Sequence, residues 1–212
     1  MRFTLTFEGD LPSNGKTRDK WNIRKQFHPQ FVELWNIDPS LQMLLKHRII
    51  SENLVTFFQH RHHDSNNPIG PIRTSLGPQD RTIDLCQEIE RQDVKFMPLV
   101  RNSLLLSCGL KITFLRSEPP GRVYQGGDLD NRLKTLFDAL SVPNNDQIVP
   151  DSESPNPIYC LLEDDSLITA VDIDTHRLLA PPNASKHHVK LIVEVSVRVT
   201  QPRGYNQIFL GS

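Results

Sequence analysis

The sequence predicts an α+β protein, because strand-like alternation near both ends of the chain brackets segments with a helical period. Residues 2–8 alternate polar and apolar side chains, and residues 189–199 carry a valine or leucine at every second position. Residues 131–140 instead have the i, i+3, i+4 and i+7 apolar spacing of an amphipathic helix. A length of 212 residues with 37% hydrophobic content suits one globular domain, or a small core with a large insertion.

Helical segments and further strands are predicted in the middle of the chain. Residues 30–50 predict two helical pieces that break at Asp38-Pro39, where proline opens the second piece and Asp38 or Ser40 caps it. Strands are predicted at residues 104–115 and 167–173, with a strand or a turn at 93–100. Stretches rich in proline and asparagine predict long loops at residues 61–79 and 141–159.

Several classes of protein are disfavoured by the composition. The longest apolar runs are far too short to cross a bilayer, so we expect no membrane partner. The first residues read as a strand rather than a secretory signal, and we therefore expect a cytoplasmic protein. Cys86, Cys108 and Cys160 are odd in number and lack CxxC spacing, which predicts reduced, mostly buried thiols.

Charge is segregated along the chain, although the formal net charge is only −1. Five basic residues and one acidic residue lie between Lys16 and Lys25. From Asp146 to Asp174 there are eight acidic residues and no lysine or arginine. This segregation fits a phosphate-binding rim beside a metal-binding centre, and ordinary solvated surface is the alternative explanation.

The most informative motif is DLDNRLK at residues 128–134. Asp128 and Asp130 precede the predicted helix, and in an extended stretch their carboxylates point to the same side and can approach one ion. Asp130 is also placed to cap the helix. Lys134 follows one helical turn later, on the same side. A pair of aspartates alone is common in helix caps and on solvated surfaces, so the specificity comes from the combination of DxDNxxK at a helix start with a later Asp-Asp pair at a strand start.

A second acidic run, Glu163-Asp164-Asp165, comes just before the predicted strand at 167–173. Hydrolysis of a phosphodiester needs an activated water, a clamp on the non-bridging oxygens and neutralisation of the leaving oxygen. Carboxylates that hold Mg²⁺ or Mn²⁺ meet the first two needs, and a lysine near the phosphate stabilises the developing charge. Asp164-Asp165 is therefore the natural source of a third ligand beside Asp128 and Asp130.

Together these features resemble the RusA family of Holliday-junction resolvases, which are crossover-junction endodeoxyribonucleases. The shared features are the N-terminal strand with Pro12-Ser13-Asn14, the strand at 110–115, the motif DLDN with Lys134, the helix ending FDAL at 137–140, and Asp164-Asp165. The resemblance covers residues 2–15 and about 108–200. It implies a small mixed β-sheet flanked by helices, a homodimer, and Mg²⁺-dependent symmetric nicking of four-way DNA junctions.

The resemblance also assigns roles by position. It implies metal ligands at Asp128, Asp130 and Asp165, and a catalytic lysine at Lys134. We expect Asn131 and Asp164 to support these residues. Contacts to nucleic acid are expected from a set of basic residues, Lys16, Arg18, Lys20, Arg24, Lys25 and Arg132.

The chain departs from the family pattern in its spacing. Asp165 lies 35 positions after Asp130, so residues 141–162 look like an insertion, and residues 16–105 are also longer than the family pattern. We expect one domain over residues 1–200, with a tail at 201–212. Asp146 lies within the insertion and is an alternative third ligand. Asp165 is preferred because a strand follows it directly.

The leading hypothesis is a nuclease that acts on branched DNA in recombination or repair, with Mg²⁺ as its cofactor and Mn²⁺ as an alternative. A second hypothesis is a module on the same fold that binds nucleic acid or protein without turnover. A third is a metal-dependent phosphohydrolase for a smaller substrate. His60, His62 and His63 lie close together in a polar stretch, and their spacing matches no closed zinc site.

Overall fold

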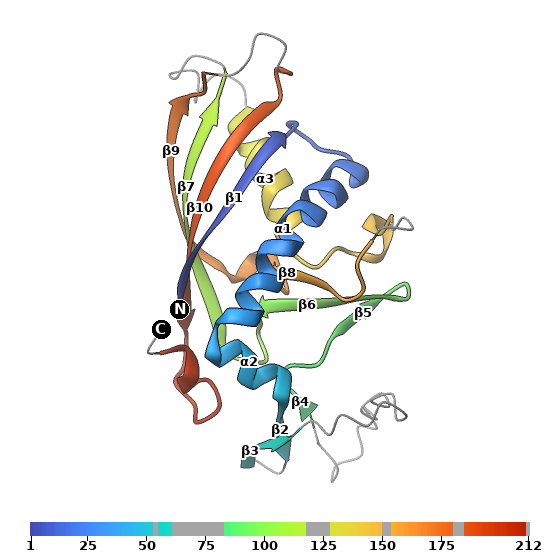
Figure 1. Ribbon diagram of the computed structural model, residues 1–212, viewed down its shortest axis with the longest axis vertical. Helices are drawn as coiled ribbons and strands as arrows, with labels where there is room; N and C mark the ends of the chain where they lie inside the picture. The colour runs from blue at the N-terminus through green and yellow to red at the C-terminus, as the bar shows by residue number, and fades with distance from the viewer. Residues whose placement is uncertain (53–54, 61–82, 118–127, 150–153, 180–184, 211–212) are drawn as a thin grey trace.

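The computed structural model describes residues 1–52, 55–60, 83–117, 128–149, 154–179 and 185–210 (Figure 1). A curved four-stranded sheet forms one side of the molecule, and helices α1 (Thr17–Ile37) and α3 (Asp128–Leu140) lie along one face of it. The described part also contains two three-stranded sheets. The predicted α+β class with a mixed sheet is confirmed. The predicted loop at 61–79 lies outside the described residues.

The four-stranded sheet has the order β1 (Arg2–Asp10), β10 (His188–Val199), β7 (Leu106–Arg116) and β9 (Ile168–Arg177). The first three strands pair antiparallel, whereas β9 runs parallel to β7. All four strands were predicted, three of them from alternation, and their ends differ from the predicted ends by a few residues.

The inner face of this sheet carries the main hydrophobic core. Strand β10 buries every second side chain there, as predicted: Val189, Leu191, Val193, Val195 and Val197. Helix α1 contributes apolar residues at intervals of four, which lie on one side of a helix: Ile23, Phe27, Phe31 and Trp35. The core therefore forms between the sheet and α1, and it fixes how α1 is placed against its neighbours.

The helical region begins earlier than predicted. Helix α1 starts at Thr17, so the basic stretch from Lys16 to Lys25 is mostly helical. The predicted break is confirmed, because α1 ends before Asp38 and α2 (Pro39–Lys46) starts at the proline. The Asp38 carboxylate accepts hydrogen bonds from the backbone N–H groups of Ser40 and Leu41, at 2.9 and 3.1 Å, and so caps α2.

The two smaller sheets come mainly from segments that the sequence did not resolve. One contains β2 (His47–Glu52), β3 (Val55–His60) and β4 (Ile83–Asp84). The other contains β5 (Ile89–Arg91), β6 (Val94–Val100) and β8 (Ile158–Leu162), with β6 and β8 parallel. Strand β6 confirms the expected element at 93–100. Strand β8 shows that the predicted loop at 141–159 ends earlier, because a buried apolar strand begins at Ile158.

The outer edge of β1 is partly covered by a glutamine from α1. The side-chain amide of Gln30 accepts a hydrogen bond from Thr6 N–H at 2.9 Å and donates one to the Thr6 carbonyl at 2.7 Å. Thr6 therefore points its backbone groups away from β10, and the side chain of Gln30 takes the place of a neighbouring strand at this position.

The remaining sequence-level expectations concern thiols, membrane helices and the tail. Cys86, Cys108 and Cys160 are all free and buried, as predicted. No helix in the described part of the chain is long and apolar enough to span a membrane. Past residue 200, Asn206 and Phe209 are buried, and the carbonyl of Phe209 accepts a hydrogen bond from the Met1 amino group. The core therefore continues into the segment expected to be a tail.

Candidate functional site

The DLDNRLK motif forms the beginning of α3. The helix starts at Asp128 rather than at residue 131, so the expectation of an extended stretch capped by Asp130 is wrong. The reason for expecting both carboxylates on one side, the alternation of an extended stretch, therefore does not apply to this segment. Asp130 is exposed in the first turn, where the positive end of the helix dipole favours a carboxylate. Lys134 is exposed one turn later, as expected.

The acidic run before β9 has three carboxylates with different roles. Glu163 accepts a hydrogen bond from the backbone N–H of Asn102 at 2.9 Å, which ties it to the turn after β6. Asp164 accepts one from the N–H of Ser166 at 2.9 Å and caps the short helix η2 (Asp165–Leu167). Asp165 is exposed, and its carboxylate has no hydrogen bond or ion pair with any described residue. Asp165 is therefore the carboxylate of this run that is left available.

Hydrogen bonding keeps Asp164 ionised. Its bonds to Ser166 hold the pKa of the Asp164 carboxyl below its ordinary value, because they favour the charged form. Asp164 holds the backbone at the start of η2 and so helps to set the position of Asp165, the first residue of that helix. The observed role of Asp164 is therefore to cap η2, and its expected support of the metal ligands stays a prediction.

Helix η2 lies against α3, and the two elements meet through the core. Leu167 of η2 is buried in the same cluster as Leu133 and Leu136 of α3. Ser141, directly after α3, forms a parallel bridge with Leu162 at the end of β8. The fold thus brings the run that contains Asp165 back to the helix that carries Asp130 and Lys134.

The structure does not assemble the complete set of expected metal ligands. Among the described residues, no three His, Cys, Asp or Glu side chains come together, and the Asp128 side chain lies outside the description. Asp146 is exposed in η1 (Asn145–Gln147) and remains the alternative to Asp165. The available donors still have the right chemistry, because exposed carboxylate oxygens suit Mg²⁺, which is often held by one or two carboxylates with water and substrate oxygens.

A polar pocket lies beside Lys134, between α1, α3 and the loop after β1. Its volume is about 160 Å³, and it is lined by Asn14, Gly15, Lys20, Asn131, Lys134, Thr135 and Asp138. The loop is held to α3 by a hydrogen bond of 2.9 Å from the Gly15 N–H to the Thr135 hydroxyl. A side chain on Gly15 would place its Cβ 2.5 Å from Cγ2 of Thr135, so the close approach requires glycine.

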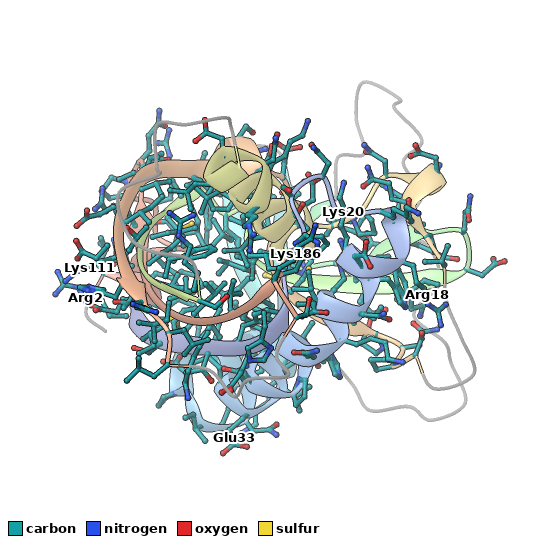
Figure 2. All side chains as sticks on the ribbon, turned by 90° about the horizontal axis from the view of Figure 1, so that it is seen from above. Arg2, Arg18, Lys20, Glu33, Lys111 and Lys186 are labelled. Atoms are coloured by element: carbon teal, nitrogen blue, oxygen red, sulfur yellow. The ribbon has the colours of Figure 1, made fainter. Side chains whose placement is uncertain are left out.

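A larger cavity, of about 460 Å³, lies on the outer face of the four-stranded sheet. It is lined in part by Arg2, Lys111 and Asp172, and by none of the expected metal ligands or basic contact residues. In Figure 2, Arg2 and Lys111 lie at the left edge of the molecule, well apart from Lys20. The size of a cavity is therefore a poor guide here, and the chemistry of its lining favours the smaller pocket.

The six expected nucleic-acid contacts separate into surface and interior groups. Lys16 and Arg18 are exposed at the start of α1, and Lys25 is half-buried. Lys20 lines the polar pocket and forms an ion pair with Asp138. Arg24 and Arg132 are each only 2% exposed, so the expectation that they contact nucleic acid is wrong for both.

Arg24 caps the C-terminal end of α3. Its Nη2 donates to the carbonyl of Asp138 at 2.7 Å and to that of Ser141 at 3.0 Å, and its Nε donates to Ser141 at 3.3 Å. The guanidinium also lies 5.6 Å from the centre of the Trp21 ring. Burial lowers the pKa of Arg24 to about 10, which leaves it charged at neutral pH. The last turn of α3 has no basic residue of its own, so α1 supplies the compensating charge.

Two features of the site were missed from the sequence: the Lys20–Asp138 ion pair and the contact of Gly15 with Thr135. Asp138 follows Lys134 by four residues, and this spacing was a signal that its carboxylate belongs to the same surface. The partner from α1 had no local signal, because it is more than 100 residues away in the chain. When the chain is compared with models of protein families, with the curated proteins and with the solved structures, none of them matches.

Proposed function

We propose that this chain is a metal-dependent endodeoxyribonuclease that cuts branched DNA, in the manner of the RusA family that its motif resembles. The observation that carries the proposal is the state of the acidic run before β9. Glu163 and Asp164 are each bonded to a backbone N–H, whereas Asp165 is left exposed on an element that packs against α3. Helix α3 carries the other carboxylates and the lysine of the proposed site.

Asp128, Asp130 and Asp165 are the residues that would hold Mg²⁺ or Mn²⁺, with Asp146 as the alternative to Asp165. A bound divalent cation would supply Lewis-acid polarisation of the phosphate and would lower the pKa of a bound water. Lys134 would contact a non-bridging oxygen and stabilise the negative charge that develops there. Asn131 lines the pocket next to Lys134, and its amide would support the site by hydrogen bonding.

The basic beginning of α1 supports a nucleic-acid substrate. Lys16 and Arg18 are exposed there, and Lys20 follows on the same helix at the edge of the polar pocket. Exposed cations at this position would contact backbone phosphates, which give affinity without sequence preference. We therefore expect binding to weaken steeply as the salt concentration rises.

The proposal is tested by incubating the purified protein with a synthetic four-way junction, a linear duplex or a simple phosphodiester, each with Mg²⁺, Mn²⁺ or EDTA. Paired nicks in opposite strands of the junction, dependent on the metal and lost in Asp130→Asn, are the expected result. Two symmetric nicks need two sites, so the active species should be a homodimer, which light scattering measures.

The other outcomes distinguish the alternatives. Junction binding without cleavage in any metal would favour a binding module without turnover. Hydrolysis of the simple phosphodiester alone would favour a phosphohydrolase for a smaller substrate. Titration of Mn²⁺ followed by electron paramagnetic resonance reports on the cation site without reference to any substrate. Loss of tight Mn²⁺ binding in Asp165→Asn, and its retention in Asp146→Asn, would identify the third ligand.

A further inference from the structure

Asp138 of α3 has a lysine on either side. Nζ of Lys20, from α1, lies 2.6 Å from Oδ2 of Asp138. Lys134 lies one turn before Asp138 on α3, and all three side chains line the polar pocket. Side chains four residues apart on a helix are close enough to form an ion pair. Lys20 and Lys134 are therefore in competition for one carboxylate.

Lys20 holds Asp138 firmly in this competition. The side chains of Lys20 and Asp138 are only 17% and 20% exposed, so water screens their attraction less than it would on an open surface. The distance of 2.6 Å is that of a strong, charge-assisted hydrogen bond. Arg24, one turn after Lys20 on α1, also donates to the main-chain carbonyl of Asp138 at 2.7 Å. Helix α1 thus grips both the backbone and the side chain of Asp138.

Lys134 takes no part in this ion pair. It is exposed, and it forms no ion pair with another residue in the described part of the chain. Two lysines and one aspartate give the pocket one net positive charge. Because Lys20 is paired with Asp138, this charge is carried by Lys134. If Lys20 were absent, the nearest cation to Asp138 on α3 would be Lys134 itself.

We propose that Lys20 is a positioning residue for Lys134: it draws Asp138 away from Lys134, so that the Lys134 ammonium group stays free to contact a phosphate oxygen in the pocket. The contact between Lys134 and a phosphate rests on the proposed function. The exchange of ion-pair partners among Lys20, Lys134 and Asp138 is independent of that function, because it depends only on these three side chains.

The exchange of partners is tested first without any substrate. In ¹⁵N-labelled protein, NMR signals of lysine ammonium groups persist where an ion pair slows their exchange with water. We expect a persistent signal from Lys20 in the wild type and none from Lys134, with the assignments made from Lys20→Arg and Lys134→Arg. In Lys20→Met, which keeps an apolar stem of similar length, the Lys134 signal should appear. It should vanish again in Lys20→Met/Asp138→Asn.

Cleavage of the four-way junction in Mg²⁺ is the second test. We expect Lys20→Met to cleave about tenfold more slowly, which is less than the loss of 100-fold or more expected from removing the charge of Lys134 outright. Lys20→Arg should cleave close to the wild-type rate, since arginine also holds a carboxylate. Asp138→Asn should restore Lys20→Met to within about threefold of the wild type.

A matched pair of variants separates positioning from net charge. Lys25→Met removes the same charge from the same helix, and Lys25→Met/Asp138→Asn restores the total charge just as the other double variant does. We expect no rescue in the Lys25 background, because Lys25 is not the residue that holds Asp138. Thermal denaturation of every variant confirms that the rates compare folded proteins.

Three results would overturn the proposal: a Lys134 signal that does not change in Lys20→Met, a double variant as slow as Lys20→Met alone, or equal rescue in the Lys25 background. If the wild type itself cleaves nothing, the proposed nuclease function fails. The NMR measurement would then still decide whether Lys20 controls the ion pairing of Lys134.

Discussion

The two ends of helix α3 are built in opposite ways. At its C-terminal end, Arg24 bonds the carbonyls of Asp138 and Ser141, and the Val142 N–H donates to the carbonyl of Leu162 at 3.0 Å. At its N-terminal end, Asp130 and Lys134 are exposed and have no ion pair with other described residues. At the C-terminal end, other parts of the protein hydrogen-bond the groups of the last turn. At the N-terminal end, charged side chains have no ion-pair partner among the described residues. The comparison indicates that charged side chains without partners, rather than the size of a cavity, are the better guide to the candidate site in this molecule.

The sharpest way to test this comparison is to alter the exposed end. We expect Asp130→Asn to slow metal-dependent cleavage by about 100-fold or more, because a carboxylate proposed to hold the cation is lost. Stability should fall by less than about 1 kcal/mol, which is the usual value of a charge at a helix N-terminus. Single-turnover rates and chemical denaturation measure the two effects. A stability loss that accounts for the lost activity would contradict the assignment.

At the buried C-terminal end of α3, a substitution should mainly reduce the stability of the protein. Arg24→Met leaves two carbonyl oxygens at the end of α3 without their charged donor, and we expect it to cost about 3 kcal/mol of unfolding free energy. In a protein of this size that corresponds to roughly 6–12 °C in Tm. Lys111→Met is the control, since its ion pair with Glu194 is exposed and 3.9 Å long. Equal losses from both substitutions would show that Arg24 does not act as a cap.

A third prediction concerns the loop that borders the pocket. Gly15→Ala should cost about 2 kcal/mol, because the new Cβ would overlap the methyl group of Thr135. Thr135→Ser removes that methyl group and keeps the hydroxyl that accepts from Gly15. We therefore expect the double variant to recover at least half of the loss in a double-mutant cycle measured by denaturant unfolding. Additive losses would mean that the two residues do not press on each other.

The smallest expected effect is a dependence of stability on pH that arises away from α3. Nδ1 of His28 accepts a hydrogen bond from the Tyr159 N–H at 3.0 Å, and burial holds the pKa of His28 below its ordinary 6.5. The unfolded chain then takes up a proton more readily, so this contribution is complete above about pH 6.5 and is lost as the pH falls from there toward the folded pKa. In His28→Asn, which accepts the same bond without titrating, urea midpoints between pH 7 and 5 should vary less than in the wild type.

Much of the fold was predictable because its signals are local. The alternation in residues 189–199 fixed which side chains of β10 face the core, and Asp38-Pro39 marked the end of α1. The spacing of Asp130 and Lys134 likewise gave their relation on one turn of α3. In each case the deciding interactions lie within a few residues of one another.

The features that escaped prediction depend on distant partners. Helix α1 was predicted only from residue 30 onward. It runs through Pro29, where the packing of Phe27 and Phe31 in the core offsets the cost of a proline inside a helix. Arg24 looked like one more surface cation in a basic run, and its burial requires the C-terminal end of α3. No local pattern in the sequence predicts this contact, because it joins residues more than 100 positions apart in the chain.

The amide of Gln30 has a consequence for how the protein behaves when it is crowded. A free strand edge invites another chain to add to the sheet, and repeated addition leads to fibres. By bonding both the N–H and the carbonyl of Thr6, Gln30 interrupts this edge near the middle of β1. A second copy would have to displace the glutamine before it could pair along the whole strand. One side chain on α1 thereby helps to keep concentrated copies of the chain from joining edge to edge.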